Sequence, residues 1–335
     1  MGSSSSLLTD TFGRHHNYLR ISLTEKCNLR CTYCMPAEGV SLSPSKHLMT
    51  ADELYEIAAL FVQQGVNKIR LTGGEPLVRK DFPQILEKLA TLPVALTLTT
   101  NAILVDRFIS HFAAAGLKKI NVSLDTLNAQ RFQKITLKDN FKQVKKNLKL
   151  LQTEGFEIKI NVVLIKDVND DEIIDFIQWT AHEPYNIRFI EFMPFDGNNW
   201  ERSKTVGLQE IQEQISCHFG LDQVIPLTSA PNDTAKTFKI KGFKGAYGII
   251  STVTNPFCDS CNRLRLTANG KLRSCLFSEE ELDLLTALRA GKPIEPIISK
   301  VVNQKKAIRA GLEAPTNFED PAHHSKNRSM IRIGG

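Results

Sequence analysis

Short runs of alternating apolar and polar residues recur along the first part of the chain and predict six β-strands. Each run is followed by a stretch with the apolar spacing of a helix, such as residues 50–64, where Thr50 is a suitable N-cap and Gly65 a stop signal. Strands that alternate with helices are typical of parallel βα units. The predicted strands are residues 19–23, 68–72, 94–100, 119–124, 158–164 and 187–192.

Five of these six strands carry polar residues at every second position, which is unusual for parallel strands covered by helices on both faces. We therefore predict an open half-barrel with a polar lumen and an active site at the C-terminal strand ends. An antiparallel sheet with one solvated face is the alternative. The polar positions that share the lumen parity are Arg20, Ser22, Lys68, Arg70, Thr72, Thr97, Thr99, Asn101, Asn121, Ser123, Asp125, Lys159 and Asn161.

The sixth predicted strand departs from this parity. Its two charged residues, Arg188 and Glu191, are an odd number of positions apart, so a regular strand directs them to opposite faces. A β-bulge would bring both to the lumen, and we predict one there.

The regular alternation stops after Met193, where turn residues such as Pro194 and Gly197 become frequent. We predict three parts: an N-terminal segment 1–17, a barrel 18–193, and a smaller C-terminal region 194–335. The C-terminal region is expected to hold a helix near 208–219, strands near 237–240 and 247–251, and helices from about 280 to 312.

Composition narrows the class of protein. The 335 residues include 42% hydrophobic residues, yet no apolar run approaches the ~20 residues of a membrane span. We read no targeting signal at the N-terminus and expect a cytoplasmic protein. The net charge of +6 favours an anionic partner. The lysine-rich stretch 142–149 has helical spacing and no interleaved aromatic residues, so it indicates a solvated face rather than a nucleic-acid site.

Seven cysteines without a secretion signal indicate metal or redox chemistry in a reducing compartment. Six of them fall into two tight groups. The seventh, Cys217, lies in an amphipathic helical stretch and is predicted to be an inert buried thiol.

The first group is Cys27, Cys31 and Cys34, with C-x3-C-x2-C spacing. Three thiolates on a 4Fe-4S cluster leave one iron open for another ligand. Zinc is the alternative, but a structural zinc site takes four ligands, and the nearest histidine on the C-terminal side is His47. With Tyr33 before the last cysteine, the motif resembles the signature of radical S-adenosylmethionine (SAM) enzymes, in which methionine chelates the open iron.

The second group is Cys258, Cys261 and Cys275, again three thiols without an adjacent fourth ligand. A second open 4Fe-4S cluster is the natural interpretation. A zinc ribbon is the alternative, although the nearest histidines are His218 and His323.

Two further motifs suit ligand binding. Gly73-Gly74-Glu75-Pro76 follows the second predicted strand, and paired glycines let a backbone edge approach a ligand closely. This loop resembles the radical SAM Gly-Gly-Glu loop that receives the amino group of SAM, although an ordinary turn is the alternative. Arg263 and Arg265 flank Leu264, and in an extended segment their guanidiniums point to one side, which suits polyphosphate or carboxylate recognition.

Both triads, together with Leu-Thr-Gly-Gly-Glu-Pro, Thr-Thr-Asn, Val-Ser-Leu-Asp, Arg-Phe-Ile-Glu-Phe-Met and the terminal Gly334-Gly335, resemble the GTP 3′,8-cyclase family of molybdenum cofactor biosynthesis. The resemblance covers nearly the whole chain and departs at Ala102, where the family commonly has Gly. It implies an α/β fold, an incomplete (βα)6 TIM-type barrel closed by a smaller α+β C-terminal region. One 4Fe-4S cluster would lie at each end of a substrate tunnel.

The resemblance also implies residue roles. Contacts with SAM are implied for Tyr33, Gly73, Gly74, Glu75, Ser123 and Met193. Contacts with GTP are implied for Arg20, Lys68, Arg70, Thr99, Lys159, Arg188, Arg263, Leu264 and Arg265. Catalytic roles are implied for Arg263, Arg265, Gly334 and Gly335.

The implied activity is that of a lyase: a 5′-deoxyadenosyl radical takes the ribose H3′ of GTP, and the C3′ radical adds to guanine C8. Implied partners are GTP, an electron donor, a second copy in a homodimer and, functionally, the downstream cyclic pyranopterin monophosphate synthase; no membrane or nucleic acid is expected. The alternatives are another radical SAM enzyme with an auxiliary cluster and a non-catalytic zinc module that binds nucleic acid.

Overall fold

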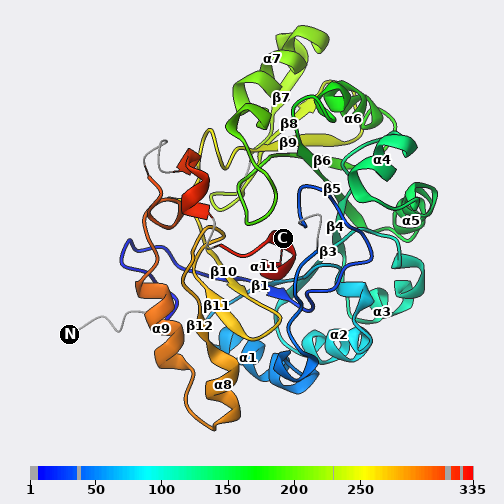
Figure 1. Cartoon of the computed structure of the whole chain (residues 1–335). Helices are drawn as coiled ribbons and strands as arrows, with labels where there is room; N and C mark the ends of the chain where they lie inside the picture. The colour runs from blue at the N-terminus through cyan, green and yellow to red at the C-terminus, as the bar shows by residue number, and fades with distance from the viewer. Residues whose placement is uncertain (1–6, 36–38, 229, 314–317, 325–326, 335) are drawn as a thin grey trace.

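A single twelve-stranded sheet organises the part of the chain that the computed structural model describes, which comprises residues 7–35, 39–228, 230–313, 318–324 and 327–334. The strand order is β12-β11-β10-β1-β2-β3-β4-β5-β6-β9-β8-β7. From β10 to β9 neighbouring strands pair in parallel, and the outer strands pair antiparallel. The strands curve into an incomplete barrel, with most helices on its outside and α11 (Met330–Ile333) within it (Figure 1).

The six predicted strands are present, and none of their ends differs from the prediction by more than one residue. They are β1 (Tyr18–Ser22), β2 (Lys68–Thr72), β3 (Ala95–Thr100), β4 (Lys119–Ser123), β5 (Glu157–Leu164) and β6 (Asn186–Glu191). The C-terminal region adds β7 (Val224–Pro226), β8 (Lys236–Ile240), β9 (Ala246–Ile250), β10 (Arg263–Leu266), β11 (Lys271–Arg273) and β12 (Leu282–Asp283). The parallel pairing of β1 to β6 excludes the antiparallel alternative.

The first long helix begins as predicted, because the Thr50 hydroxyl and the Glu53 side chain form a capping box. The helices of the barrel are α1 (Ala51–Gln63), α2 (Phe82–Ala90), α3 (Ile109–Ala114), α4 (Ala129–Thr136), α5 (Phe141–Thr153) and α6 (Ile173–Trp179). Those that follow are α7 (Leu208–Phe219), α8 (Leu284–Arg289) and α9 (Glu295–Asn303). Among the described residues, none of the helices combines the length and apolarity of a membrane span.

The C-terminal region extends the barrel at both edges. β9 pairs with β6, and β10 pairs with β1, so strands of the C-terminal region extend both edges of the same sheet. The predicted partial TIM-type barrel with a C-terminal region is confirmed, while the division of the chain at 193 stays a prediction. The prediction for Cys217 is wrong: α7 buries Ile211 and Ile215, and the thiol lies exposed on its other face.

The predicted lumen parity is confirmed for eleven of the thirteen positions, since only Ser22 and Thr97 are buried without lining the cavity. On β5, Ile158 and Ile160 are buried in the hydrophobic core, whereas Lys159 and Asn161 line a central cavity. Parallel strands are usually apolar on both faces, so this alternation marks the cavity as a polar site enclosed by the barrel.

The predicted bulge in the sixth strand is wrong. β6 pairs with β5 and β9 in unbroken register, so Arg188 faces the cavity and Glu191 faces away from it. The Glu191 carboxylate accepts hydrogen bonds from the backbone N–H groups of Leu208 (3.1 Å), Val253 (2.7 Å) and Thr254 (3.0 Å). These donors satisfy the buried charge outside the lumen, and they tie β6 to the start of α7 and to the loop after β9.

We expect Glu191→Ala to destabilise the protein by about 3 kcal/mol, because it leaves the N–H donors of Val253 and Thr254 without their acceptor, while the Leu208 N–H keeps only the Thr254 hydroxyl at 3.3 Å. The measurement is the thermal unfolding midpoint of the anaerobic protein. Glu87→Ala, at an exposed position of α2, is the control and should change stability by less than ~0.5 kcal/mol. Equal midpoints for the two variants would contradict the role given to Glu191.

Candidate active site

A cavity of about 560 Å³ runs through the barrel and is lined by all six cysteines of the two triads. The first triad follows β1 and therefore lies at the C-terminal end of the parallel strands. Cys258 and Cys261 precede β10, which runs parallel to β1, so the second triad lies at the opposite end. The two triads, far apart in sequence, face one enclosed space.

The first triad has acidic surroundings. Burial, followed by the nearby Glu75 carboxylate, raises the pKa of the Cys27 thiol to about 11. Burial, followed by Cys27 and Asp125, raises the pKa of Cys34 to about 12. These thiols therefore need a bound cation to become thiolates. The Cys27 sulfur accepts hydrogen bonds from the Leu29 N–H (3.4 Å) and the Asn101 amide (3.9 Å), which fix its position.

The second triad has cationic surroundings. Burial alone would raise the pKa of the Cys261 thiol, but the Lys305 ammonium and the Arg263 guanidinium lower it to about 6. The Lys305 Nζ lies 3.5 Å from the Cys261 sulfur, and the backbone N–H of Arg309 donates to Cys258 at 3.5 Å. Cys261 is therefore prepared to carry negative charge, whereas burial raises the pKa of Cys258.

Both triads fit the donor set of an iron–sulfur cluster. No three His, Cys, Asp or Glu side chains in the described part of the chain are grouped as a single metal ion would need. A 4Fe-4S cluster makes a different demand, since each thiolate binds its own iron. Three thiols at each end of the cavity meet that demand, and each triad would leave one iron of its cluster without a protein ligand.

The glycine loop has a structural reason for its residues. A Cβ on Gly73 would lie 2.6 Å from the Thr24 carbonyl oxygen, and one on Gly74 would lie 2.4 Å from that of Lys26. The loop thereby packs edge to edge against the chain just before the first triad, with Gly74 N–H donating to Thr24 at 2.8 Å. Both glycines also line the cavity.

Glu75 does not line the cavity. Its buried carboxylate accepts from the Asn101 N–H (2.7 Å) and the Thr100 hydroxyl (2.8 Å), which joins the glycine loop to the end of β3. Ala102 follows with φ +62° in the left-handed region, as expected where the family commonly has glycine. The turn is held by the Asn147 amide, which donates to the Ala102 carbonyl at 2.7 Å.

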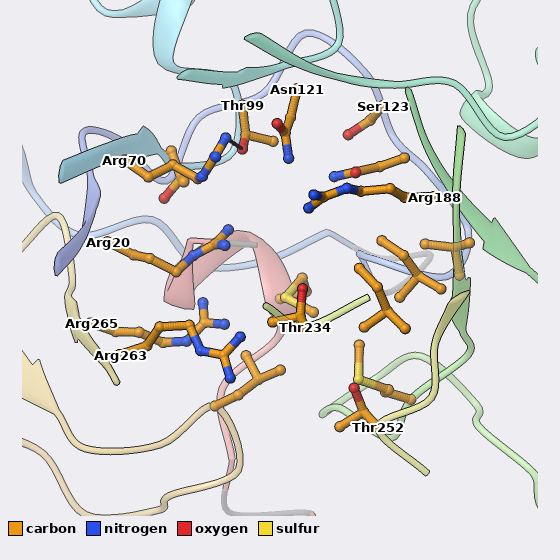
Figure 2. Close-up of a pocket in the computed structure, with 18 of the residues that line it drawn as sticks. Arg20, Arg70, Thr99, Asn121, Ser123, Arg188, Thr234, Thr252, Arg263 and Arg265 are labelled. Atoms are coloured by element: carbon orange, nitrogen blue, oxygen red, sulfur yellow. Dashed lines mark hydrogen bonds between the residues drawn. The ribbon is translucent and has the colours of Figure 1, made fainter. Parts of the chain in front are cut away.

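Cations project into the cavity from opposite walls. Figure 2 shows Arg20, Arg263 and Arg265 on one side and Arg188 facing them. Arg70 donates to the Thr99 hydroxyl at 3.3 Å, and this contact orients its guanidinium across the lumen (Figure 2). The cavity is therefore suited to a ligand with several negative charges.

Most residues predicted for SAM or GTP line this one cavity. They are Arg20, Tyr33, Lys68, Arg70, Gly73, Gly74, Thr99, Ser123, Lys159, Arg188, Met193, Arg263 and Arg265. Leu264 does not, because its fully buried side chain packs into the core on the other face of β10.

Tyr18 is a cavity residue that the sequence prediction missed. Its hydroxyl accepts from the Arg70 Nε at 2.5 Å, and the Lys68 ammonium lies 4.7 Å from its ring centre. Burial would raise its pKa, but Arg70, Arg20 and Lys68 together lower it to about 7. The sequence signal was present, since Tyr18 shares the parity of Arg20, but only polar residues were counted along the lumen.

The C-terminal tail reaches this site. Ile331 and Ile333 are buried, and the carbonyl of Gly334 accepts from the Arg265 guanidinium at 2.6 Å. A Cβ on Gly334 would lie 2.5 Å from the Thr72 hydroxyl, so only glycine fits this approach. Gly335 lies outside the described residues.

Comparison with known proteins identifies the family. Residues 21–180 match the Radical SAM superfamily, and residues 185–310 match Molybdenum Cofactor Synthesis C. GTP 3′,8-cyclase of Listeria welshimeri is 39% identical over 98% of this chain and 99% of its own length. The chain belongs to the GTP 3′,8-cyclase family. Its cofactors are accordingly SAM and two 4Fe-4S clusters, for which the two triads are the donors that fit.

Two longer relatives match nearly the whole of this chain, and one solved structure shares its fold. Mitochondrial GTP 3′,8-cyclase of Arabidopsis thaliana is 43% identical over 99% of this chain and 84% of that protein. Molybdenum cofactor biosynthesis protein 1 of Drosophila melanogaster is 44% identical over 98% of this chain, which spans only 60% of that protein. Streptococcus suis SuiB bound to S-adenosylmethionine shares the fold, with a TM-score of 0.61, 15% identity, and coverage of 90% of this chain and 67% of SuiB.

We expect Cys31→Ala to abolish reductive cleavage of SAM, because two thiolates hold the first cluster poorly. Cys261→Ala should leave that cleavage intact and remove about half of the iron. The measurements are 5′-deoxyadenosine formation and iron content under anaerobic conditions, and Cys217→Ala, outside both triads, is the control. Retained 5′-deoxyadenosine formation in Cys31→Ala would refute the assignment of the first triad.

Proposed function

We propose that this protein is a radical SAM GTP 3′,8-cyclase, a lyase that forms 3′,8-cyclo-7,8-dihydro-GTP in the first step of molybdenum cofactor biosynthesis. The observation that carries the proposal is the single cavity that joins both cysteine triads and is lined by cations on opposite walls. When bound at the first triad, the cluster and SAM would supply, on one-electron reduction by the donor, methionine and a 5′-deoxyadenosyl radical for removal of H3′ from GTP. The C3′ radical would add to C8, and a second electron with a proton would give the 7,8-dihydro product.

The chain's own part is to bind and orient the substrate between the two ends. Arg20, Arg70 and Arg188 project from three different strands, and we assign them to the triphosphate together with Lys68 and Lys159. A triphosphate carries about four negative charges, so its desolvation requires several cations in a fixed arrangement. Held in this way, the nucleotide keeps its ribose facing the first triad and its base facing the second. The barrel around the nucleotide excludes water from the reacting atoms.

Other cavity residues take the remaining roles. We assign Tyr33, Ser123 and Met193 to SAM, together with the backbone of Gly73 and Gly74. The Tyr33 hydroxyl donates to Asp125 at 2.7 Å, which fixes the ring beside the first triad. Glu75 acts as a positioning residue for the glycine loop.

Arg263, Arg265 and the terminal glycines are assigned to the step after radical formation. Arg265 already holds the Gly334 carbonyl beside the cavity. An electron donor, a cytoplasmic location, a homodimer and supply of product to a cyclic pyranopterin monophosphate synthase complete the proposal.

The proposal is tested by anaerobic incubation of reconstituted protein with reductant, SAM and GTP. The expected products are 5′-deoxyadenosine and a cyclised guanosine triphosphate in comparable amounts, identified by mass spectrometry. With 3′-deuterated GTP, deuterium should appear in 5′-deoxyadenosine. Cleavage of SAM without deuterium transfer would exclude GTP as the substrate.

Tyr18 predicts a pH dependence of GTP binding. Its pKa of about 7 means that the phenolate prevails at higher pH and pairs with Arg70, in competition with the triphosphate. Relative to Tyr18→Phe, wild-type affinity for GTP should therefore fall as pH rises through 7, by up to about tenfold at pH 8.

The measurement is anaerobic calorimetry from pH 6 to 8. Ionisation of GTP itself and of Lys159, whose pKa burial and Arg188 lower to about 8, is common to both proteins and cancels in the ratio. Tyr55→Phe, on α1, is the control and should follow the wild type. A constant ratio of the two dissociation constants across this range would contradict the competition.

The docked position of the tail predicts that its loss will uncouple SAM cleavage from formation of the cyclised product. Deletion of Gly334 and Gly335 should leave both clusters and most SAM cleavage intact but largely abolish the cyclised product. Gly334→Ala should do the same, because its Cβ would meet Thr72. Gly291→Ala is the matched control, since Gly291 also has a positive φ (65°) but has open space around it. Wild-type product yield from the truncated protein would show that the tail is dispensable.

A further inference from the structure

Lys305 is a buried cation with an unusual set of acceptors. It follows α9 and is only 4% exposed. Its Nζ donates to the Ser274 carbonyl at 2.7 Å, to the Arg263 carbonyl at 2.9 Å, and to the Cys261 sulfur at 3.5 Å. An ammonium has three N–H donors, so these acceptors use its full capacity.

The acceptors place Lys305 between the two chain segments that carry Cys261 and Cys275 of the second triad. Arg263 lies two residues after Cys261, and Ser274 directly precedes Cys275. One side chain therefore ties together the chain segments that carry two of the three thiols, which enter this region from β10 and β11. Its loss would free these segments to move relative to each other.

None of the three acceptors is a carboxylate, so the charge of Lys305 needs another source of compensation. A buried cation is costly unless an anion lies nearby. By contrast, Arg14 beside the same segment is paired with Asp10 at 2.6 Å while it donates to the Cys258 carbonyl at 3.0 Å. The Cys261 sulfur, 3.5 Å from the Lys305 Nζ, would supply such a charge as a thiolate.

We propose that Lys305 is a positioning residue for the second iron–sulfur cluster, which it holds through Cys261 and whose reduced, more negative state it stabilises. The inference rests on the cluster assignment but is independent of the cyclase reaction. Hydrogen bonds to cluster sulfurs and net charge near a cluster both set its reduction potential. A fixed ammonium 3.5 Å from a ligating sulfur supplies both effects.

The experiment compares Lys305→Met, Lys305→Arg and Lys306→Met in anaerobically reconstituted protein. Lys306 is the matched control, because it is the next residue and is exposed. The measurements are iron content and a redox titration of each cluster followed by electron paramagnetic resonance. Neither depends on turnover of GTP.

In Lys305→Met, the ratio of reduced to oxidised second cluster at a fixed potential should fall about tenfold, which equals ~59 mV for one electron. The first cluster should be unchanged, Lys305→Arg should recover most of the difference, and Lys306→Met should match the wild type. If Lys305→Met cannot hold the second cluster, retention of that cluster by Lys305→Arg supports the role of the charge.

Two results would overturn the inference. An unchanged potential of the second cluster in Lys305→Met, with full iron content, would exclude the electrostatic role. Equal loss of the second cluster from Lys305→Met and Lys305→Arg would show that packing, and not charge, is what the site needs. A wild-type protein that binds only about four irons would refute the cluster assignment itself.

Discussion

Arg20, Arg70 and Arg188 converge from three strands on one enclosed space, where these cations repel one another. Burial, together with Arg70, lowers the pKa of Arg20 to about 10, although Tyr18 acts in the opposite direction. Such a concentration of charge is unfavourable without an anion. The barrel can hold it because apolar residues of alternate parity pack under the helices and stabilise the strands that carry it.

The two ends of the cavity differ in the charges that surround their cysteines. At the first triad, burial, followed by Glu75 at Cys27 and by Cys27 and Asp125 at Cys34, raises the pKa of the thiols, so their protons leave when metal binds. At the second triad, Lys305 and Arg263 outweigh burial at Cys261 and lower its pKa, whereas burial raises the pKa of Cys258. An electron added to the second cluster would therefore be better compensated by the protein than one added to the first. This asymmetry suits a strongly reducing cluster at one end and a substrate-binding cluster at the other.

The strands, the lumen and the cysteine triads could be predicted from sequence because each depends on local spacing. Period-two alternation fixes which face a residue occupies, and Lys159 and Asn161 obeyed it. Glu191 could not be placed, because its compensation comes from Val253 and Thr254, which are distant in sequence. For the same reason, the sequence did not predict the pairing of β10 with β1, which brings Arg263 and Arg265 of β10 to the cavity. Glu75 was predicted as a ligand contact, yet its carboxylate is buried outside the cavity, where it accepts hydrogen bonds from Thr100 and Asn101 at the end of β3.

The tail connects the two functions of the cavity. Ile331 lies where a Cβ on Gly74 would approach it to 2.9 Å, so the tail packs against the glycine loop at the cofactor end. Three residues later, Gly334 is held by Arg265, one of the cations that line the cavity. Because one short segment touches both, the tail fixes the glycine loop and the Arg265 guanidinium relative to each other. The two ends of the cavity are therefore joined not only by the strands of the barrel but also by a contact from the end of the described chain.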